Sequence, residues 1–167
     1  MADNTIYQFS APRFDGTAVS LDHYKNKVLL IVNTASQCGF APQLKELVEL
    51  KKEFIDQDFE ILAFPSNDFG GQEPLEGDAI GEFCESYGAN FPTFDKIRVR
   101  GPYADDLYKF FADKKANGVL SSVPRWNFHK FLINREGVLV DFYYPFTKPT
   151  SSKIKKRVAK LLAAAQR

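Results

Sequence analysis

The stretch Lys27-Val-Leu-Leu-Ile-Val-Asn-Thr34 decides the fold, because its apolar part, Val28 to Val32, is continuous rather than alternating. Such a run is typical of a strand that is covered on both faces. From Pro42 onward the apolar period changes to that of a helix with one buried face, formed by Leu44, Leu47, Val48, Phe54 and Ile55. Residues 59–64 are again strand-like. A strand, a helix and a strand in this order predict a parallel βαβ unit with a right-handed crossover.

The segments on either side extend this unit. Residues 7–22 indicate two short extended segments around the turn signal Asp15-Gly16. Residues 65–77 are rich in turn residues and predict a loop. We expect helices at about 78–87, 104–115 and 151–165, and a hairpin over 128–144. The whole chain, residues 1–167, is therefore predicted to be one α/β domain with a thioredoxin-like fold, in which helices flank a central mixed sheet that follows an N-terminal β-hairpin.

Composition excludes several classes of function. The chain has 22 basic and 21 acidic residues, a balance that gives no bulk attraction to nucleic acid or to an anionic membrane. The central apolar run is five residues long, far below the roughly 20 that span a bilayer. The N-terminus lacks the features of a secretory signal, and two cysteines, Cys38 and Cys84, suit a reducing compartment. We therefore expect a cytoplasmic protein with no nucleic-acid partner and no membrane span.

One edge of the predicted sheet collects the polar residues of interest. Ligands of open α/β sheets gather beyond the carboxyl ends of the parallel strands. Cys38 follows the first of these strands, and Asn67 and Gln72 follow the second. If the strand that starts near Phe128 runs antiparallel to these two strands, Trp126 and Asn127 lie at the same edge. A cysteine between a strand and a helix N-terminus has a lowered thiol pKa, so Cys38 is a candidate nucleophile.

Several thiol chemistries are less consistent with the sequence. A Cys-His pair with His23 or His129 remains open but has no motif behind it, and we expect both histidines at the surface or in packing. The spacings of a zinc site are absent, so no metal is expected. A disulfide reductase of the thioredoxin type would need a second cysteine where Ala41 stands, three residues after Cys38.

Peroxide reduction fits the side chains that we expect around Cys38. Gln72, Trp126 and Asn127 supply neutral hydrogen-bond donors. Such donors suit a thiolate that displaces an oxygen leaving group, because they stabilise the charge that develops on that oxygen. The product is a sulfenic acid on Cys38, which can condense with a second thiol, and this chemistry requires no cofactor.

Three blocks of sequence closely resemble the signature blocks of the glutathione peroxidase family: Val32-Asn-Thr-Ala-Ser-Gln-Cys-Gly-Phe40, Phe64-Pro-Ser-Asn-Asp-Phe-Gly-Gly-Gln-Glu-Pro74 and Trp126-Asn-Phe-His-Lys-Phe-Leu132. The resemblance extends over about residues 6–165 and implies a thioredoxin-like fold. It also implies a catalytic tetrad in which Cys38 attacks the peroxide and Gln72, Trp126 and Asn127 surround it. Cysteine here stands in place of the selenocysteine of many animal members.

A fourth segment, Phe83-Cys-Glu-Ser-Tyr-Gly-Ala-Asn-Phe-Pro92, is similar to the one that holds the resolving cysteine in the two-cysteine branch of this family. The resemblance implies that Cys84 forms a disulfide with Cys38 and that a thioredoxin-like protein reduces it. A one-cysteine enzyme recycled by glutathione, a peroxide sensor that relays its oxidation, and a non-catalytic binding module remain as alternatives. The short connection over 115–126 resembles that of monomeric members.

The chain departs from the family pattern at three positions, where Thr34, Ala41 and Asp68 replace the usual residues. Asp68 matters most, because a negative charge near a thiolate would raise the pKa of the thiol. Asn67 is expected to brace the glycine-rich loop. We also expect residues 78–90 to unfold locally so that the two cysteines can meet, since Gly81 within the helix and Gly88 at its end weaken it.

A basic run lies on the predicted C-terminal helix. Because the opposite face of this helix is regularly apolar, we interpret the run as a solvated face rather than a membrane or nucleic-acid site. It comprises Lys153, Lys155, Lys156, Arg157 and Lys160.

Overall fold

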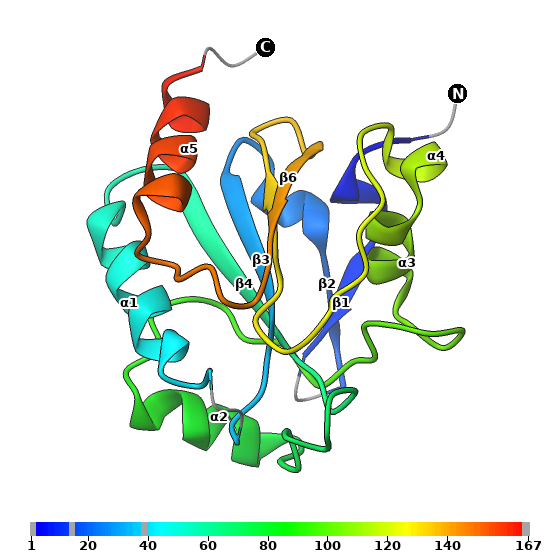
Figure 1. Cartoon of the computed structure of the whole chain (residues 1–167), viewed down its shortest axis with the longest axis vertical. Coiled ribbons are helices and arrows are strands. Elements are labelled where there is room, and N and C mark those ends of the chain that lie inside the picture. Colours follow the sequence, from blue (N-terminus) through cyan, green and yellow to red (C-terminus); the bar gives the residue numbers. More distant parts are fainter. Residues whose placement is uncertain (1–2, 14–15, 38–39, 165–167) are drawn as a thin grey trace.

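A four-stranded mixed sheet forms the centre of the computed structural model, which describes residues 3–13, 16–37 and 40–164 (Figure 1). The strand order is β4-β3-β5-β6. β3 and β4 are parallel, whereas β5 is antiparallel to both β3 and β6. This is the predicted thioredoxin-like arrangement, and it brings the carboxyl ends of β3 and β4 to the same edge as the start of β5. The strands are β3 (Val28–Thr34), β4 (Phe59–Pro65), β5 (Lys130–Ile133) and β6 (Leu139–Tyr143).

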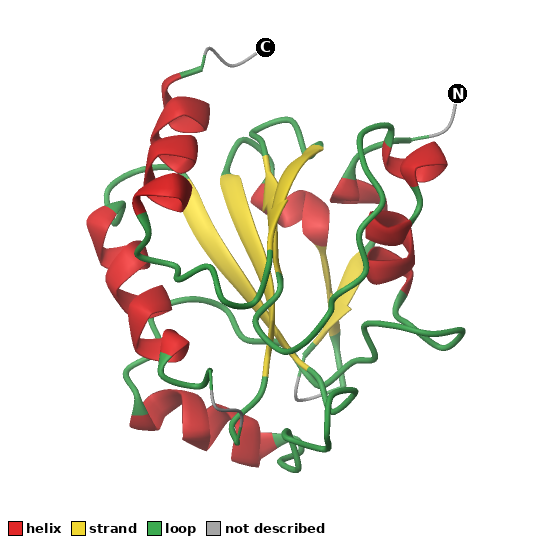
Figure 2. Cartoon of the chain, viewed as in Figure 1, coloured by secondary structure: helices red, strands yellow, loops and turns green. Residues whose placement is uncertain are grey.

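Helices cover both faces of the sheet. Figure 2 shows α1 and α5 on one side and α3, α4 and the N-terminal hairpin on the other, with α2 across the end of the sheet. The helices are α1 (Gln43–Glu53), α2 (Asp78–Ser86), α3 (Asp106–Ala112), α4 (Lys114–Asn117) and α5 (Ser152–Ala163). The hairpin consists of β1 (Ser10–Pro12) and β2 (Ala18–Ser20), and two short 3-10 helices, η1 (Ile6–Gln8) and η2 (Leu21–Tyr24), accompany it.

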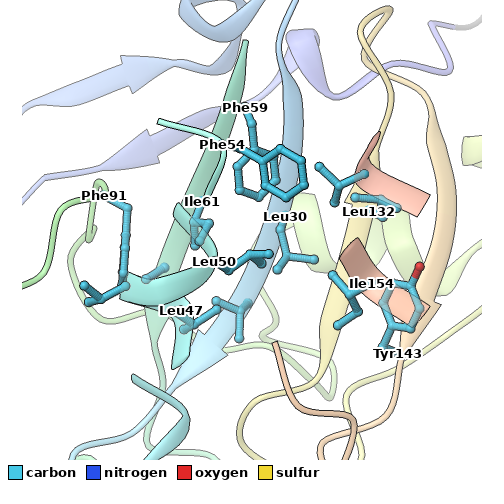
Figure 3. Packing of buried hydrophobic residues seen from close by; sticks show 14 of the residues in the cluster. Leu30, Leu47, Leu50, Phe54, Phe59, Ile61, Phe91, Leu132, Tyr143 and Ile154 are labelled. Atoms are coloured by element: carbon cyan, nitrogen blue, oxygen red, sulfur yellow. The ribbon is translucent and has the colours of Figure 1, made fainter. Parts of the chain in front are cut away.

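Two hydrophobic clusters hold these layers together, one on each face of the sheet. Residues of β3 alternate between them: Leu30 belongs to the cluster under α1 and α5, whereas Leu29 and Ile31 belong to the opposite one. Figure 3 shows the first cluster, in which Leu47 and Leu50 of α1 pack beside Leu30. The continuous apolar run of the sequence is thus explained by a strand that is buried on both faces.

The buried face of α1 differs from the prediction at its C-terminal end. The helix ends at Glu53 with Phe54 as its C-cap, so the helical period no longer applies to the next residue. Ile55 is therefore 54% exposed, and its predicted burial was wrong. Leu50, which lies inside the helix, is fully buried instead.

The helix predicted over 104–115 is interrupted, and this prediction was wrong in its extent. Asp113 adopts an extended backbone, with φ of −120° and ψ of 100°, between α3 and α4. Its carboxylate accepts a hydrogen bond from the N–H of Lys115 at 3.0 Å and so caps a new helix. Asp105 caps α3 in the same way, through the N–H of Leu107 at 3.1 Å.

Gly88 lies at the end of α2, as predicted, but there it terminates the helix rather than weakening it. It lies two residues after the last helical residue, Ser86, and has a φ of 76°. In this left-handed region glycine is favoured, and its N–H donates to the carbonyl of Glu85 at 3.1 Å. Gly81 remains as a glycine in the interior of α2.

The basic run of α5 lies on the solvent side of that helix, as predicted. Ile154, Val158 and Leu162 are buried on the opposite side, and Lys155 forms an ion pair with Glu53 at 3.1 Å. Within the described ranges, every helix is too short or too polar to cross a membrane.

Candidate active site

Gln72 and Asn127 meet at the carboxyl edge of the sheet. Nδ2 of Asn127 donates a hydrogen bond to Oε1 of Gln72 at 3.1 Å. Asn127 is fully buried just before β5, whereas Gln72 is partly exposed in the loop after β4. Since Oε1 of Gln72 accepts this bond, its Nε2 group is left as the donor end of the carboxamide.

Trp126 packs against the same loop. Its ring lies 5.3 Å from the ring of Phe69, centroid to centroid. A Cβ placed on Gly70 would lie 3.4 Å from the Trp126 indole and 3.6 Å from Cγ of Gln72. The glycine, whose φ is 65°, therefore lets the loop approach both of these side chains.

The backbone around Asn127 is held by Asn33 of β3. Nδ2 of Asn33 donates to the carbonyl of Trp126 at 3.1 Å, and the N–H of Phe128 donates to the carbonyl of Asn33 at 2.6 Å. Phe128 has a φ of 69°, a conformation that is uncommon for a bulky residue. Such a conformation persists where the surroundings fix it, and here the two hydrogen bonds with Asn33 do so.

Cys38, the predicted nucleophile, lies outside the described residues. The chain that leads to it is tied to the same loop: the N–H of Gln37 donates to the carbonyl of Gln72 at 2.9 Å. Ser36 donates to the carboxylate of Glu73 from its backbone nitrogen at 3.1 Å and from its hydroxyl at 2.8 Å. The residue that precedes Cys38 in the sequence is thus hydrogen-bonded to the backbone of Gln72.

Cys84 lies on the apolar face of α2, as predicted, and is a free thiol. It is 9% exposed, and the hydroxyl of Tyr87 donates a hydrogen bond to its sulfur at 3.4 Å. Thr34 and Ala35, at the end of β3, line the same small cavity as Cys84. The sulfur therefore lies beneath the segment that leads to Cys38.

Glu73 and Lys130 are buried ionisable residues that the sequence reasoning missed. Burial raises the pKa of Glu73, a carboxylate that is 2% exposed. Burial lowers the pKa of Lys130 to about 7; its Nζ donates to the carbonyls of Phe128 at 2.7 Å and Pro145 at 3.2 Å. The signal for Glu73 was its place beside Gln72, and that for Lys130 was a lysine in an otherwise apolar strand.

Asp68 points toward residues 98–100. Its carboxylate accepts hydrogen bonds from the N–H of Val99 at 2.7 Å and of Arg100 at 3.3 Å, and Nε of Arg98 lies 3.4 Å from it. These donors compensate its charge. Asn67 braces the loop, as expected, because its Oδ1 accepts from the N–H of Glu73 at 2.9 Å.

Neither histidine belongs to this site. His23 is exposed, whereas His129 is buried and bonded to the hydroxyl of Ser122 at 3.0 Å. Burial lowers the pKa of His129 to about 4, so the ring is neutral at ordinary pH. In the part of the chain that the structure describes, no cluster of His, Cys, Asp and Glu could hold a metal ion.

The fold places the chain among the thioredoxin-like proteins. A thiol:disulfide interchange protein of the thioredoxin family from Chlorobium tepidum has the same fold, with a TM-score of 0.64, 15% identity and coverage of 93% of each chain. Two other solved structures are more similar in sequence. The crystal structure of Trgpx in apo form has a TM-score of 0.75, 35% identity and coverage of 96% of each chain. That of T. cruzi GPX1 has a TM-score of 0.76, 32% identity and coverage of 98% of this chain and 99% of that one.

Sequence comparison defines the family: this chain belongs to the glutathione peroxidase family, whose model matches residues 6–112. The glutathione peroxidase of Lactococcus lactis subsp. cremoris is 45% identical over 158 residues, which cover 94% of this chain and 99% of the relative. The hydroperoxy fatty acid reductase gpx1 of Synechocystis sp. is 45% identical over 167 residues, covering 96% and 98%. The chain is accordingly a peroxidase.

Proposed function

We propose that this peroxidase reduces hydrogen peroxide and organic hydroperoxides with Cys38 as the nucleophile and Gln72, Trp126 and Asn127 as its catalytic partners. The observation that carries the proposal is the hydrogen bond between Asn127 and Gln72, in a loop that also bonds Gln37 next to Cys38. This contact unites two of the three partners from distant parts of the sequence, and Trp126 adjoins them.

The first step transfers one peroxide oxygen to sulfur. The Cys38 thiolate attacks the nearer oxygen, the O–O bond breaks, and the second oxygen leaves with the bonding electrons and takes up a proton. Cys38 becomes a sulfenic acid and the peroxide becomes water or an alcohol. The carboxamide donors and the indole N–H stabilise the charge on the departing oxygen.

The second step is resolution by Cys84. Its sulfur attacks the sulfenic acid, water is released, and a Cys38–Cys84 disulfide remains, which a thioredoxin-like protein reduces by thiol–disulfide exchange. The position of Cys84 under the end of β3 supports this role. Because the sulfur of Cys84 is 9% exposed on the inner face of α2, the proposal includes an opening of this helix during the step.

Recycling by glutathione is the second candidate, and the burial of Cys84 favours it, because a sulfur that is 9% exposed attacks only after the helix moves. A sensor that passes its oxidation to a partner protein would use the same thiols. A coupled assay that compares thioredoxin with glutathione as the electron donor distinguishes the two recycling routes.

Two variants test the assignment of the thiols. Cys38→Ser should abolish turnover with every reductant. Cys84→Ser should still reduce one equivalent of peroxide but lose cycling with thioredoxin. Undiminished cycling of Cys84→Ser would remove Cys84 from the mechanism, whereas multiple turnovers of Cys38→Ser would overturn the proposal as a whole.

We also propose that the protein is a monomer and that it is located in the cytoplasm. On the edge strand β4, the N–H of Ala63 donates to the carbonyl of Pro92 at 3.0 Å and its carbonyl accepts from the N–H of Phe94 at 2.9 Å, so part of this edge is covered against pairing with another copy. Light scattering of the purified chain tests the monomer, and a stable dimer at micromolar concentration would contradict it.

Relatives from plants include proteins named as chloroplastic, so imaging of the tagged chain in its own cell tests the location.

A further inference from the structure

A small, largely apolar cavity lies beneath α2, apart from the Gln72–Asn127 contact. Its volume is about 10 Å³, and residues at the end of β3, in the loop after β4 and around α2 line it. The polar side chains among them include those of Cys84, Tyr87, Glu73 and Thr93, and the hydroxyl of Thr93 bonds that of Tyr87. A cavity of this size has room for about one water molecule.

Tyr87 acts on the sulfur of Cys84 directly. Its hydroxyl donates to that sulfur at 3.4 Å, from a position one helical turn further along the chain. Burial raises the pKa of Tyr87 far above its ordinary value, so the hydroxyl stays protonated and remains a donor. A donor at this distance stabilises the thiolate more than the thiol.

Glu73 supplies the carboxylate of the cavity. It is 2% exposed, and both of its oxygens accept hydrogen bonds from Ser36, at 3.1 Å and 2.8 Å. Burial raises its pKa, and the hydrogen bonds from Ser36 and the backbone of Leu75, followed by the charge of Lys96, lower it in part. Nζ of Lys96 donates to the carbonyl of Glu73 at 3.1 Å. Lys96 itself pairs with Glu76 at 3.3 Å. The ionisable groups that face Glu73 are therefore Lys96 on one side and Tyr87 and Cys84 of α2 on the other.

We propose that Glu73 is the proton acceptor for the thiol of Cys84, and that Tyr87 holds the resulting thiolate. The inference rests on the proposed function, because it gives Cys84 its role in resolution. The proposal gives a reason for the burial of the Glu73 carboxylate beside a site in which the proposed partners of Cys38 are all neutral. A base whose proton affinity lies nearer to that of a thiol is better matched to this transfer than an ordinary carboxylate.

The S–H bond of Cys84 breaks, and its proton passes to Glu73, through a water in the cavity or directly. As α2 opens, the thiolate leaves the cavity and attacks the sulfur of the Cys38 sulfenic acid, an S–S bond forms and the S–O bond breaks. The hydroxide that leaves takes up one proton, which restores the charge of Glu73 and yields water. Cys84 sulfur is oxidised and the sulfenic sulfur is reduced, so no other oxidant or reductant is needed.

A single-turnover experiment tests this inference. Reduced enzyme is mixed with one equivalent of hydrogen peroxide, without a reductant, and the fluorescence of Trp126, the one tryptophan of the chain, is followed in time. Sulfenic acid formation depends on the peroxide concentration, whereas disulfide formation does not. The two phases are measured from about pH 5 to about pH 9 for the wild type, Glu73→Gln and, as a control for the same change of residue, Glu49→Gln. Glu49 is exposed on α1, so its variant should behave as the wild type.

Glu73→Gln should slow the second phase at least about tenfold near neutral pH and leave the first phase within about twofold. The wild-type second phase should level off above the pKa of Glu73, whereas that of Glu73→Gln should keep rising toward the ordinary thiol pKa of about 8.5. The glutamine can still bond Ser36, because its oxygen accepts from the N–H and its amide donates to the hydroxyl. An unchanged second phase, or equal slowing of both phases, would overturn the inference.

Tyr87→Phe provides a second variant in case Glu73→Gln does not fold. It should slow the second phase and leave the first phase unchanged, because the hydroxyl that donates to the Cys84 sulfur is removed. An unchanged second phase would overturn the role of Tyr87. A wild type without a second phase, identical to Cys84→Ser, would instead contradict the proposed function itself.

Discussion

Asn127 donates its side-chain N–H to Oε1 of Gln72 at 3.1 Å, although the two residues are 55 positions apart in the chain. The contact fixes the direction of both carboxamides, since an oxygen that accepts leaves the nitrogen of the same amide as the donor. Asn127 is fully buried. Asn33 holds the backbone on both sides of it, through hydrogen bonds with the carbonyl of Trp126 and the N–H of Phe128. The donor end of Gln72 is therefore oriented before any substrate binds, as electrostatic stabilisation of a departing oxygen requires.

Asn127→Asp should reduce the rate constant of peroxide reduction by about 100-fold, the size of effect found when one such donor is removed. The substitution replaces the donor with a carboxylate oxygen that repels Oε1 of Gln72 and raises the pKa of a neighbouring thiol. Peroxide consumption in single turnover measures the rate, and alkylation of Cys38 against pH measures the thiol pKa in a Cys84→Ser background. A rate within about threefold of the wild type would mean that Asn127 only braces the loop.

The free energy of unfolding should rise with pH above about 7 because of Lys130, whose pKa burial lowers to about 7. In the unfolded chain its pKa is the ordinary value of about 10.4. Between these two values the unfolded chain binds a proton that the folded protein lacks, so stability increases by at most about 1.4 kcal/mol per pH unit. Below about pH 7 both states are protonated and the effect is constant.

Lys130→Met tests this prediction, since it removes the titration and keeps the length of the side chain. Urea unfolding of both proteins at about pH 7, 8 and 9 should show a difference in stability that shifts in favour of the wild type as pH rises. The loss of the bonds to Phe128 and Pro145 adds an offset that does not depend on pH. Parallel pH profiles would contradict the lowered pKa of Lys130.

The sequence predicted those parts of the molecule that depend on periodicity or on short blocks. The burial of β3 follows from five consecutive apolar residues, and the meeting of Gln72 with Asn127 follows from the topology of the sheet. The buried charges could not be read in this way, because charged residues are rarely buried and lack a period. Lys130 and Glu73 are buried because backbone carbonyls and Ser36 satisfy them, and those partners become neighbours only in the folded chain.

The sequence also did not predict which way the carboxylate of Asp68 points. Its partners, Val99 and Arg100, lie about thirty positions further along the chain. The interruption between α3 and α4 has a local cause that sequence could have shown. Asp113 precedes two lysines and is a good N-cap residue, so it can start a helix where the apolar period alone would continue one.

Asp68→Ala should destabilise the protein without changing the chemistry of Cys38. The N–H of Val99, a residue that is 1% exposed, would lose its acceptor, which costs about 1–3 kcal/mol. Because the carboxylate is paired with residues 98–100, the pKa of Cys38 should stay the same, as measured by alkylation against pH. Asp56→Ala, at an exposed position after α1, is the control and should change stability by less than about 0.5 kcal/mol. A lowered pKa of Cys38 in Asp68→Ala would show that the charge of Asp68 acts on the thiolate.

The opening of α2 can be tested by changing helix propensity in opposite directions. Gly81→Ala should stabilise the helix by about 1 kcal/mol, and Ala79→Gly should destabilise it by a similar amount. If opening precedes disulfide formation, the first variant should slow that step by up to about fivefold and the second should accelerate it, since 1 kcal/mol corresponds to about a factor of five. Both positions are partly exposed, so packing changes little.

Hydrogen exchange provides an independent measurement of the same opening. Amides of α2 should lose protection when the enzyme is oxidised, whereas those of α5, which packs against β3 through Ile154, should keep it. We expect this loss of protection in α2 because the helix has an interior glycine and lies across the end of the sheet rather than over a face (Figure 1). Equal protection of α2 in both redox states, together with equal disulfide rates in Gly81→Ala and Ala79→Gly, would mean that Cys84 reaches its partner without local unfolding.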